Sequence, residues 1–467
     1  MKTIIFIKTL LLAFTMVSNS YAEEEYDLFV QQDAKQLEET ETKRQASEGK
    51  DKEVINLGRY NKDLRAVSRG SRLFFKIKNK EIIFRVDNTR RKNETRFSFS
   101  ASSDNNDTLY IAENDGRVVG SLHHSGKLFK LRPNGKGETL LIEVPKEVLI
   151  DHDESYYEDS SNTLLKQPSP VSVFSAGSAF ADSGAEFTVI VAYTAQFATA
   201  AGDVDAYMDL LELETNTTYT NSEVQTSVNI IHAYQTSYSD SGSFYTDRSY
   251  FSNAGNPETQ ELYDLRDLYQ ADIMMVLTGN GYSFCGIART IGATESEALA
   301  LGSETCSTGY YTFGHEIGHL FGARHIIAND SSTTPFPYGH GYCNVTPNTW
   351  RTVMAYGCPS GTGGPRIQQW SNPNVFINNE PTGTIDLEFN AMVMNVRADE
   401  VANFRSSTDR FDINGDGCID QGDLIEMLPY LDTPVPPAPV SMDVNYDSMV
   451  DIDDYNLVIA SSGLGCQ

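Results

Sequence analysis

Three histidines and one glutamate form a closely spaced group in the middle of the chain. His315, Glu316 and His319 stand in the pattern His-Glu-x-x-His, and His325 follows. On a helix, residues four apart share one face, so the imidazoles of His315 and His319 can both reach one metal ion. Glu316 is poorly placed to be a third ligand, but its carboxylate can reach a water on the metal. The spacing therefore predicts one catalytic zinc ion, with Glu316 as the general base.

The third histidine requires the helix to end. Six residues correspond to roughly 240° around a helix, so a continuous helix would turn His325 away from His319. Gly322 can adopt the left-handed conformation that ends a helix and turns the chain back. Three neutral imidazoles then leave a fourth position for water, as in a catalytic rather than a structural zinc site. A core helix with satisfied histidines is the alternative, which the combined spacing disfavours.

The extended motif resembles the signature of the metzincin zinc endopeptidases. Besides the three histidines and Gly322, the stretch Thr352-Val-Met-Ala-Tyr-Gly-Cys358 is similar to the Met-turn of that clan. Within the clan, the chain is most similar to bacterial reprolysin-like enzymes of the peptidyl-Asp metalloendopeptidase type. The segments that carry this closer likeness are Phe284-Cys-Gly-Ile-Ala, Tyr338-Gly-His-Gly-Tyr342 and Trp370-Ser-Asn-Pro-Asn. The likeness covers residues 185–405.

The resemblance implies a secreted endopeptidase that is made as a zymogen and hydrolyses proteins or peptides. It implies cleavage next to Asp, which needs a cationic pocket, and Arg324 and Arg351 are the cations nearest the motif in sequence. Tyr356 is implied as a hydrogen-bond donor to the oxyanion, with packing beneath the site as the alternative. Met354 is implied as the floor of the site, and His340 is expected in a loop rather than on the metal.

Two acidic loops near the C-terminus have the ligand pattern of calcium loops. Side-chain oxygens and one backbone carbonyl recur at the positions that coordinate Ca²⁺. The first loop offers Asp412, Asn414, Asp416, the Cys418 carbonyl, Asp420 and Asp423; the second offers Asp443, Asn445, Asp447, the Met449 carbonyl, Asp451 and Asp454. Gly417 stands at the turn of the first loop, whereas Ser448 replaces it in the second and predicts a weaker site. The pair resembles a dockerin, which implies two structural Ca²⁺ ions and a cohesin-like partner; a purely calcium-stabilised module and a disordered acidic tail are the alternatives.

The residues around the motif alternate between strand and helix patterns. Strands are predicted at 187–193, 227–234 and 271–278, and helices at 203–217, from Pro257 and at 389–404. This order predicts a mixed α/β (α+β) metzincin catalytic domain over 185–405, with a twisted sheet and an active-site helix. Strand patterns at 72–77, 81–86, 95–100 and 139–144 predict a β-rich domain before it. A small α-helical, EF-hand-like module is expected over 407–467.

The first 22 residues have the pattern of a secretory signal peptide, cleaved after Ala22. We expect a β-rich propeptide and linker to follow over 23–180, with the linker beginning at residue 151. The net charge of −28 disfavours nucleic acid and anionic membranes as partners. No later stretch approaches membrane-spanning length, which predicts no membrane insertion.

The six cysteines all follow residue 284, and export permits disulfides. Proximity in sequence suggests the pairs Cys285–Cys306, Cys343–Cys358 and Cys418–Cys466, with free thiols or a metal cluster as alternatives.

A propeptide that keeps the enzyme inactive cannot do so by placing a cysteine on the zinc, because no cysteine precedes Cys285. A propeptide must therefore block the site with an Asp, Glu or His side chain or by steric cover, and Lys166 is a candidate cleavage site.

His123 and His124 point to opposite faces of a strand, which disfavours a shared metal. Two other hypotheses stay open: a calcium-dependent binding or assembly protein with an inactive protease-like domain, and an adhesion module in place of a propeptide.

Overall fold

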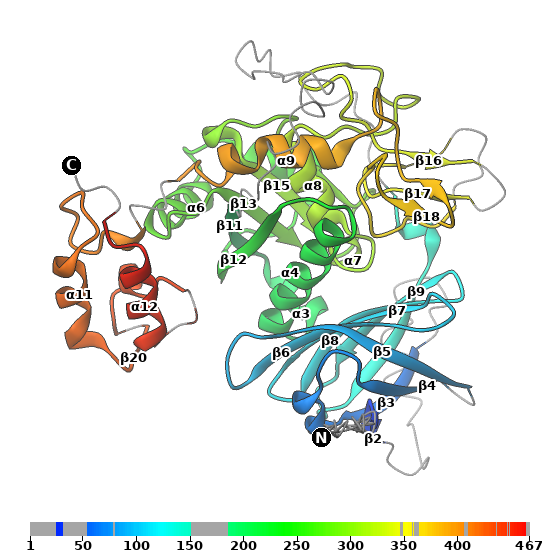
Figure 1. Ribbon diagram of the computed structural model, residues 1–467, viewed down its shortest axis with the longest axis horizontal. Coiled ribbons are helices and arrows are strands. Elements are labelled where there is room, and N and C mark those ends of the chain that lie inside the picture. Colours follow the sequence, from blue (N-terminus) through cyan, green and yellow to red (C-terminus); the bar gives the residue numbers. More distant parts are fainter. Residues whose placement is uncertain are drawn as a thin grey trace, which may run out of the picture.

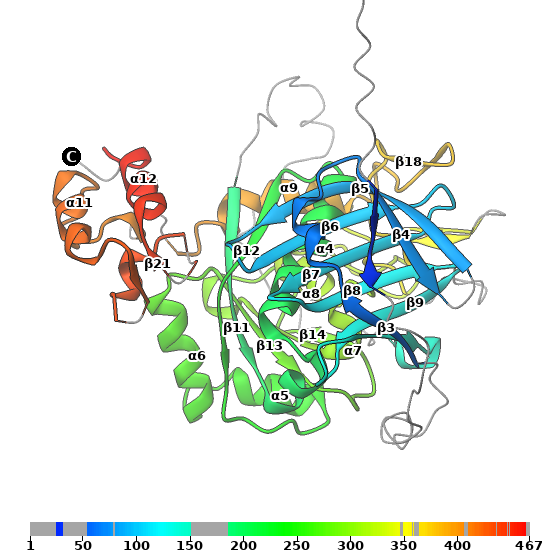
Figure 2. The same cartoon turned by 90° about the horizontal axis from the view of Figure 1, so that it is seen from below.

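The computed structural model describes residues 25–30, 54–77, 80–150, 185–345, 349–356, 358, 364–405, 410–435, 437–445, 447 and 449–463. The predicted signal peptide, the linker with Lys166, and Ser448 and Cys466 lie outside these residues. The described chain forms an N-terminal β-sheet, a central α/β region and a small C-terminal helical unit (Figure 1). The C-terminal unit lies beside α6 and away from the N-terminal sheet (Figure 2). No helix of the described part is long and apolar enough to cross a bilayer.

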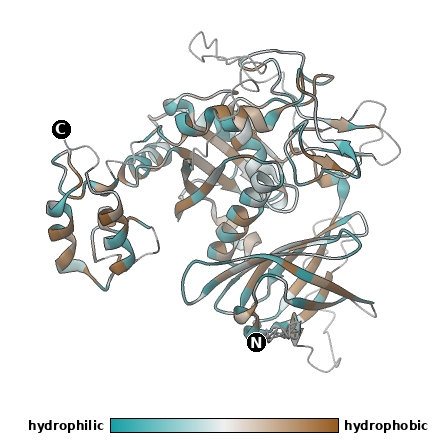
Figure 3. Ribbon diagram, in the orientation of Figure 1, coloured by the Kyte–Doolittle hydropathy of each residue, from teal (hydrophilic) through white to brown (hydrophobic). Residues whose placement is uncertain are grey.

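The N-terminal region is a ten-stranded sheet in the order β1-β4-β5-β6-β7-β8-β9-β10-β3-β2. Its strands are β1 Glu25–Asp27, β2 Phe29–Val30, β3 Val54–Tyr60, β4 Arg72–Ile77, β5 Lys80–Arg91, β6 Arg96–Ser102, β7 Thr108–Asn114, β8 Arg117–His124, β9 Lys127–Pro133 and β10 Thr139–Val144. Apolar residues recur along these strands (Figure 3), and one face of the sheet packs into its own core around Phe75, Phe84 and Phe99. The expected β-rich region is therefore present.

The central strands of this sheet are buried on both faces. β7, β8 and β9 have uninterrupted runs of buried residues, whereas β5 alternates between buried and exposed positions. The second face of the central strands is covered by the central α/β region, because Tyr110, Ala112 and Val119 belong to the same apolar core as helix α4 (Val204–Asn221). Sequence reasoning found β4, β5, β6 and β10, and missed these doubly buried strands.

The central region is a mixed α/β layer structure, as predicted. Its five-stranded sheet has the order β12-β11-β13-β15-β14, with β14 antiparallel at one edge. The strands are β11 Ala185–Tyr193, β12 Thr226–Gln235, β13 Ile273–Thr278, β14 Gly286–Ala288 and β15 Leu299–Ser303; the helices are α3 Ala195–Ala201, α4 Val204–Asn221, α5 Phe244–Phe251, α6 Pro257–Leu268, α7 Glu304–Ser307, α8 Thr312–Phe321 and α9 Asn390–Val401. Asp203 caps α4, as predicted, because its carboxylate accepts from the amide of Ala206. Two short ladders, β16 Cys343–Asn344 with β17 Trp350–Arg351 and β18 Phe376–Ile377 with β19 Glu380–Pro381, complete the region.

The C-terminal unit consists of two helices around a small apolar core. Helices α11 Gln421–Met427 and α12 Ile452–Ala460 each begin at a capping aspartate, Asp420 and Asp451. A two-stranded ladder, β20 Thr433–Pro434 with β21 Met449–Val450, joins the two halves. Ile419 and Val450, one from each acidic loop, are fully buried in this core. The expected helical character is therefore present, and the repeat of the two loops extends to their packing.

The disulfides follow the proximity prediction where both cysteines are described. Cys285 pairs with Cys306, and Cys343 pairs with Cys358. Cys418 is also disulfide-bonded, and its predicted partner Cys466 lies outside the described residues.

Candidate active site

Helix α8 positions the histidines and ends where the sequence predicts. It spans Thr312–Phe321, and Gly322 follows at φ +106°, in the left-handed region. The Gly322 amide donates to the His319 carbonyl at 2.9 Å, which closes the last turn. A Cβ on Gly322 would also lie 3.0 Å from Phe336 and Pro335. Both the backbone conformation and the available space therefore require glycine here.

The three imidazoles converge through one nitrogen each. His325 Nε2 lies 2.9 Å from His315 Nε2 and 3.1 Å from His319 Nε2. The Nδ1 atoms of His315 and His319 each lie 2.9 Å from a backbone carbonyl, those of Val353 and Ala323. A carbonyl accepts only, so each Nδ1 carries the proton and each Nε2 presents its lone pair to the shared point. A cation with nitrogen ligands fits this arrangement, and all three rings are buried.

Glu316 lies on the same helix but faces the edge strand of the sheet. Its Oε1 is 2.8 Å from the position that a Cβ on Gly286, the first residue of β14, would occupy. Glycine at 286 is therefore what allows the carboxylate to lie against the edge strand. Sequence reasoning included Gly286 in a segment that resembles the family but gave it no role, because only the pairing of β14 beside α8 reveals that role.

The Met-turn lies beneath the histidines. Met354 Sδ is 3.2 Å from the Cβ position of Gly318, in the middle of α8, so Met354 packs against the helix. The Tyr356 ring stands 4.2 Å from the His325 ring, at 88° to it. His340 is buried, and its Nδ1 lies 2.8 Å from the His325 carbonyl, so it supports the loop that carries His325. The Tyr356 ring is thus in direct contact with the ring of His325.

The arginines near the motif differ in their partners. Arg324 is buried and pairs with the buried Asp330 at 2.5 Å, so its charge is already neutralised. Arg351 donates to the Ala355 carbonyl at 3.1 Å and to the Tyr310 hydroxyl at 2.9 Å, both neutral acceptors.

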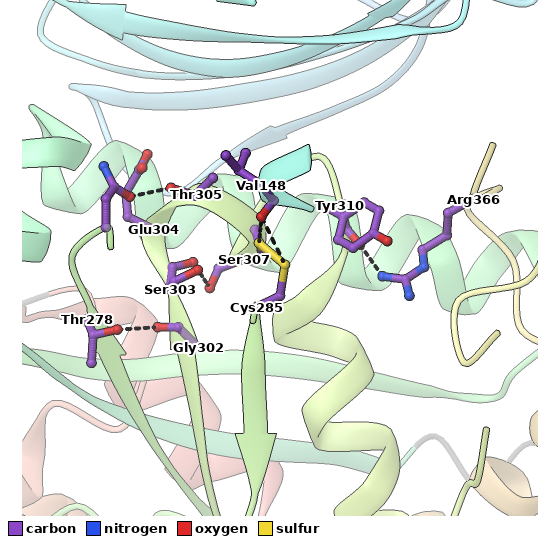
Figure 4. Close-up of a disulfide and its surroundings, with 12 residues drawn as sticks. Val148, Thr278, Cys285, Gly302, Ser303, Glu304, Thr305, Ser307, Tyr310 and Arg366 are labelled. Carbon is purple, nitrogen blue, oxygen red and sulfur yellow. Dashed lines mark hydrogen bonds between the residues drawn. A yellow bond between two sulfur atoms is a disulfide. The ribbon is translucent and has the colours of Figure 1, made fainter. Parts of the chain in front are cut away.

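A second arginine, which sequence reasoning missed, lies beside Arg351. Arg366 donates to the Tyr310 carbonyl at 3.0 Å (Figure 4) and to the Ala355 carbonyl at 3.3 Å. Its guanidinium carbon lies 4.0 Å from the centre of the Tyr310 ring. Ala355 directly precedes Tyr356, so two cations flank the segment next to the histidines. Both line a cleft of 1620 Å³ between the N-terminal sheet and the central region.

Two groups of side chains among the described residues could hold a metal ion. One is His315, His319 and His325, and the other is Asp443, Asp447 and Asp454 in the second acidic loop. His123 and His124 do not share a site: His123 stacks on Tyr311, and His124 pairs with Asp107 at 3.1 Å. Burial lowers the pKa of His123 to about 4, so this ring is neutral.

The two acidic loops have the same internal hydrogen bonds. In the first, the Asp416 amide donates to Asp412 at 3.0 Å and the Asn414 amide donates to Asp423 at 3.1 Å. In the second, the matching bonds are Asp447 to Asp443 at 3.0 Å and Asn445 to Asp454 at 3.0 Å.

The second loop brings its carboxylates closer together than the first. Burial raises the pKa of Asp454 to about 6, and the charges of Asp447 and Asp451 add to this effect. The loop without a turn glycine, which the sequence predicted to be the weaker site, is thus the one that gathers three carboxylates.

Comparison with known proteins gives matches over most of the chain. The model of a reprolysin-type family described as metallo-peptidase family M12 matches residues 183–371. A protein of Xanthomonas campestris called peptidyl-Asp metalloendopeptidase is 36% identical over 301 residues, which cover 64% of this chain and 70% of the relative. A protein of the same name from Stenotrophomonas maltophilia is 35% identical over 316 residues, or 67% of this chain and 74% of the relative. Metalloproteinase-II from Bacteroides fragilis aligns with 65% of this chain and 89% of its own, at 11% identity and a TM-score of 0.37, which is too low to support an argument.

Proposed function

The chain belongs to metallo-peptidase family M12 and is a zinc metalloendopeptidase, and on that premise we propose that His315, His319 and His325 hold its catalytic zinc. One observation carries the assignment. The Nε2 atoms of His315 and His319 lie 2.9 Å and 3.1 Å from that of His325, while their Nδ1 atoms are held by carbonyls. Three nitrogen ligands with a fourth position open to water are what a catalytic zinc site requires.

We propose Glu316 as the general base and Tyr356 as a stabiliser of the oxyanion. When bound, zinc lowers the pKa of water toward ~7 and polarises the scissile carbonyl. Glu316 takes a proton from the attacking water and later delivers it to the leaving amine. Tyr356, beside His325, donates a hydrogen bond to the developing oxyanion. The side of β14 away from β15 leaves an edge against which an extended peptide can add as a further strand.

Two substitutions, one at the proposed base and one at a proposed zinc ligand, distinguish a loss of catalysis from a loss of metal binding. Glu316→Gln is expected to retain zinc and to lose casein cleavage, whereas His325→Ala is expected to lose both. Zinc content is measured by atomic emission on the purified protein, and cleavage is measured with and without chelator. A Glu316→Gln enzyme with full activity would refute the role of Glu316. A wild-type protein that holds zinc but cleaves nothing would support the alternative of a binding or assembly protein with an inactive protease-like domain.

A preference for bonds next to Asp is proposed from the names of the relatives and from the paired cations. Arg351 and Arg366 flank Ala355, one residue from Tyr356. A substrate carboxylate beside two guanidinium groups gains charge-assisted hydrogen bonds. Peptide-library cleavage gives the preference, and Arg351→Met should reduce kcat/KM for an Asp peptide far more than for its Asn counterpart.

The division of the chain is also a proposal. We assign residues 1–22 to a signal peptide, 23–180 to a propeptide and linker, 185–405 to the protease domain and 407–467 to a calcium module, in a secreted zymogen. Mass spectrometry of the exported protein tests this division: loss of residues 1–22 and then of about 23–180 is expected. A secreted form that is active and still covalently linked to 23–180 would favour an adhesion module instead.

The C-terminal unit is proposed as a dockerin-like module with two structural Ca²⁺ ions. The repeated hydrogen bonds of the two loops and the carboxylates of Asp443, Asp447 and Asp454 support calcium binding. A partner surface is supported by large apolar side chains that are 47–59% exposed on and beside the two helices: Ile425, Leu428, Ile452 and Ile459. Calorimetric titration with Ca²⁺, followed by binding to a cohesin, tests both parts. Calcium binding without cohesin binding would leave a calcium-stabilised module.

A further inference from the structure

Helix α4 presents a row of carboxylates to the basic strands of the N-terminal sheet. Arg96 of β6 contacts Asp209 at 2.5 Å, and Arg117 of β8 contacts Asp203 at 2.7 Å. Glu212 is paired twice, with Arg90 of β5 and with the nearby Lys92. The side chains of these three carboxylates are 1–6% exposed, so the N-terminal sheet removes them from water. Without the N-terminal sheet, the negative charge on this face of α4 would repel other anions and attract a basic surface.

A second group of charges lies at the start of α7. Glu304 meets Lys130 at 3.1 Å and Arg132 at 2.5 Å, and all three side chains are 6% exposed. Burial acts to raise the pKa of Glu304, but the two cations outweigh it and hold this pKa at about 2. Removing one member of such a group leaves a buried charge without compensation, which is strongly unfavourable.

Apolar contacts join the same two surfaces. Tyr110, Ala112 and Val119 lie in the core that contains Tyr207, Leu211 and the rest of the apolar face of α4. Gly309, at φ +72°, brings the backbone so close that a Cβ there would lie 2.6 Å from Leu128. The contact is thus closely packed as well as charged, which is typical of stable association.

The C-terminal end of the N-terminal region reaches the edge strand. The Cys285 amide donates to the Ile150 carbonyl at 2.7 Å, and the Val148 carbonyl lies 3.9–4.0 Å from both sulfurs of the Cys285–Cys306 disulfide (Figure 4). Cys285 directly precedes Gly286, which faces Glu316. Ile150 therefore occupies a backbone position on the edge that an extended substrate would use.

From these contacts we propose that the N-terminal domain, residues 25–150, is a non-covalent inhibitor that stays docked on α4 and the β14 edge after the linker is cut. The proposal rests on the proposed zymogen function. Cleavage of the linker alone then leaves the enzyme latent. Activity appears only when the docked domain is destroyed or displaced, because the Ile150 carbonyl occupies the Cys285 amide beside β14 and residues of the sheet form part of the cleft that Arg351 and Arg366 line.

The test uses the full chain with a recognition sequence for a site-specific protease inserted within residues 151–184. After cutting, co-elution of the two fragments is measured by size-exclusion chromatography at about 0.1 M and about 1 M NaCl, since the part-exposed guanidinium groups of Arg90 and Arg117 are screened at high salt. Hydrolysis of a peptide substrate is measured on the same fractions. We expect co-elution with suppressed hydrolysis at low salt, and a rise in hydrolysis of roughly tenfold or more once the fragments separate.

Charge variants make the result specific to this interface. Arg117→Glu, at a half-exposed position that does not endanger folding, should weaken retention by roughly 30-fold. Glu304→Arg should weaken retention further, and combination with Arg132→Glu should partly restore it. Lys62→Glu is the matched control, because Lys62 pairs with Asp115 at 3.2 Å within the N-terminal region and both are exposed.

Each outcome decides one part of the proposal. Fragments that separate at low salt, or an Arg117→Glu variant that behaves like Lys62→Glu, would overturn docking. Co-eluting fragments that are fully active would overturn inhibition. If the separated catalytic fragment holds zinc and hydrolyses nothing, the proposed peptidase site is wrong, while the co-elution result still decides whether the domain docks.

Discussion

The close approach of Gly286 to the Glu316 carboxylate gives a quantitative prediction. A Cβ at this position would lie 2.7 Å from the Leu301 carbonyl oxygen, 2.7 Å from Thr312 Cγ2 and 2.8 Å from Glu316 Oε1. Ordinary contacts begin near ~3.4 Å, so a methyl group requires a displacement of roughly 0.6 Å. The Leu301 oxygen belongs to the β14–β15 ladder and Thr312 to the first turn of α8. Glu316 Oε1 is the end of a flexible side chain, so among these three neighbours it is the atom that moves most readily.

The magnitude follows from two effects of the added methyl group in Gly286→Ala. Overpacking of a dense interior costs about 1–3 kcal/mol of unfolding free energy. A displacement approaching ~1 Å at a reacting group costs about 100-fold in rate. We expect kcat to fall roughly 10- to 100-fold while bound zinc is unchanged, since no histidine contacts Gly286.

The assay is steady-state hydrolysis of a fluorogenic peptide, with zinc content and thermal unfolding measured on the same sample. Gly302→Ala is the matched control, because Gly302 pairs with Gly286 across the ladder and its Cβ would meet Ser307 Oγ at 2.8 Å instead. The control should lower the melting temperature and keep kcat. Wild-type kcat in Gly286→Ala, or an equal loss of kcat in the control, would refute a local effect on Glu316.

Three further outcomes are expected. Gly322→Ala should lose zinc and activity together, because φ +106° and the contacts with Phe336 oppose a side chain; zinc retained at wild-type affinity would contradict this. Asp447→Asn should abolish the rise in melting temperature that Ca²⁺ gives the wild type, as followed by circular dichroism, while casein cleavage stays unchanged. Burial raises the pKa of Glu214 to about 7 from an ordinary 4.5, against the opposing effects of Ser121 and Lys130. The contribution of Glu214 to stability is therefore complete below about pH 4.5 and is lost as the pH rises through 7. The loss amounts to up to about 3 kcal/mol of unfolding free energy. The urea concentration at the midpoint of unfolding should therefore fall between pH 5 and 7 in the wild type, and fall less in Glu214→Gln.

The convergence of the three histidines follows from local sequence because its determinants are local. His315 and His319 are one helical turn apart, and Gly322 ends the helix through its own backbone conformation. No distant residue is needed to infer that three imidazoles converge. The same holds for the capping of α4 by Asp203 and for the repeated hydrogen bonds of the two acidic loops.

Features that depend on contacts between distant segments could not be inferred from the local sequence. Gly286 gains its role from a strand of three residues that pairs with β15 and packs on α8, and so short a strand gives no periodic signal. Arg366 is brought beside Arg351 by a parallel backbone bridge between segments 15 residues apart, and both side chains reach Tyr310. In β9, Lys130 and Arg132 alternate with Phe129 and Leu131, yet both cations are buried because they pair with Glu304 of the central region.

The core shared by β7, β8 and α4 has a consequence for how the protein acquires its structure. Tyr110, Ala112 and Val119 supply part of the apolar interior against which α4 packs. Any route that removes residues 25–150 after folding removes contacts that helped to order α4. Loss of those contacts would lower the free energy of unfolding of the remaining domain, and the lifetime of its folded state would then depend more strongly on its rate of unfolding.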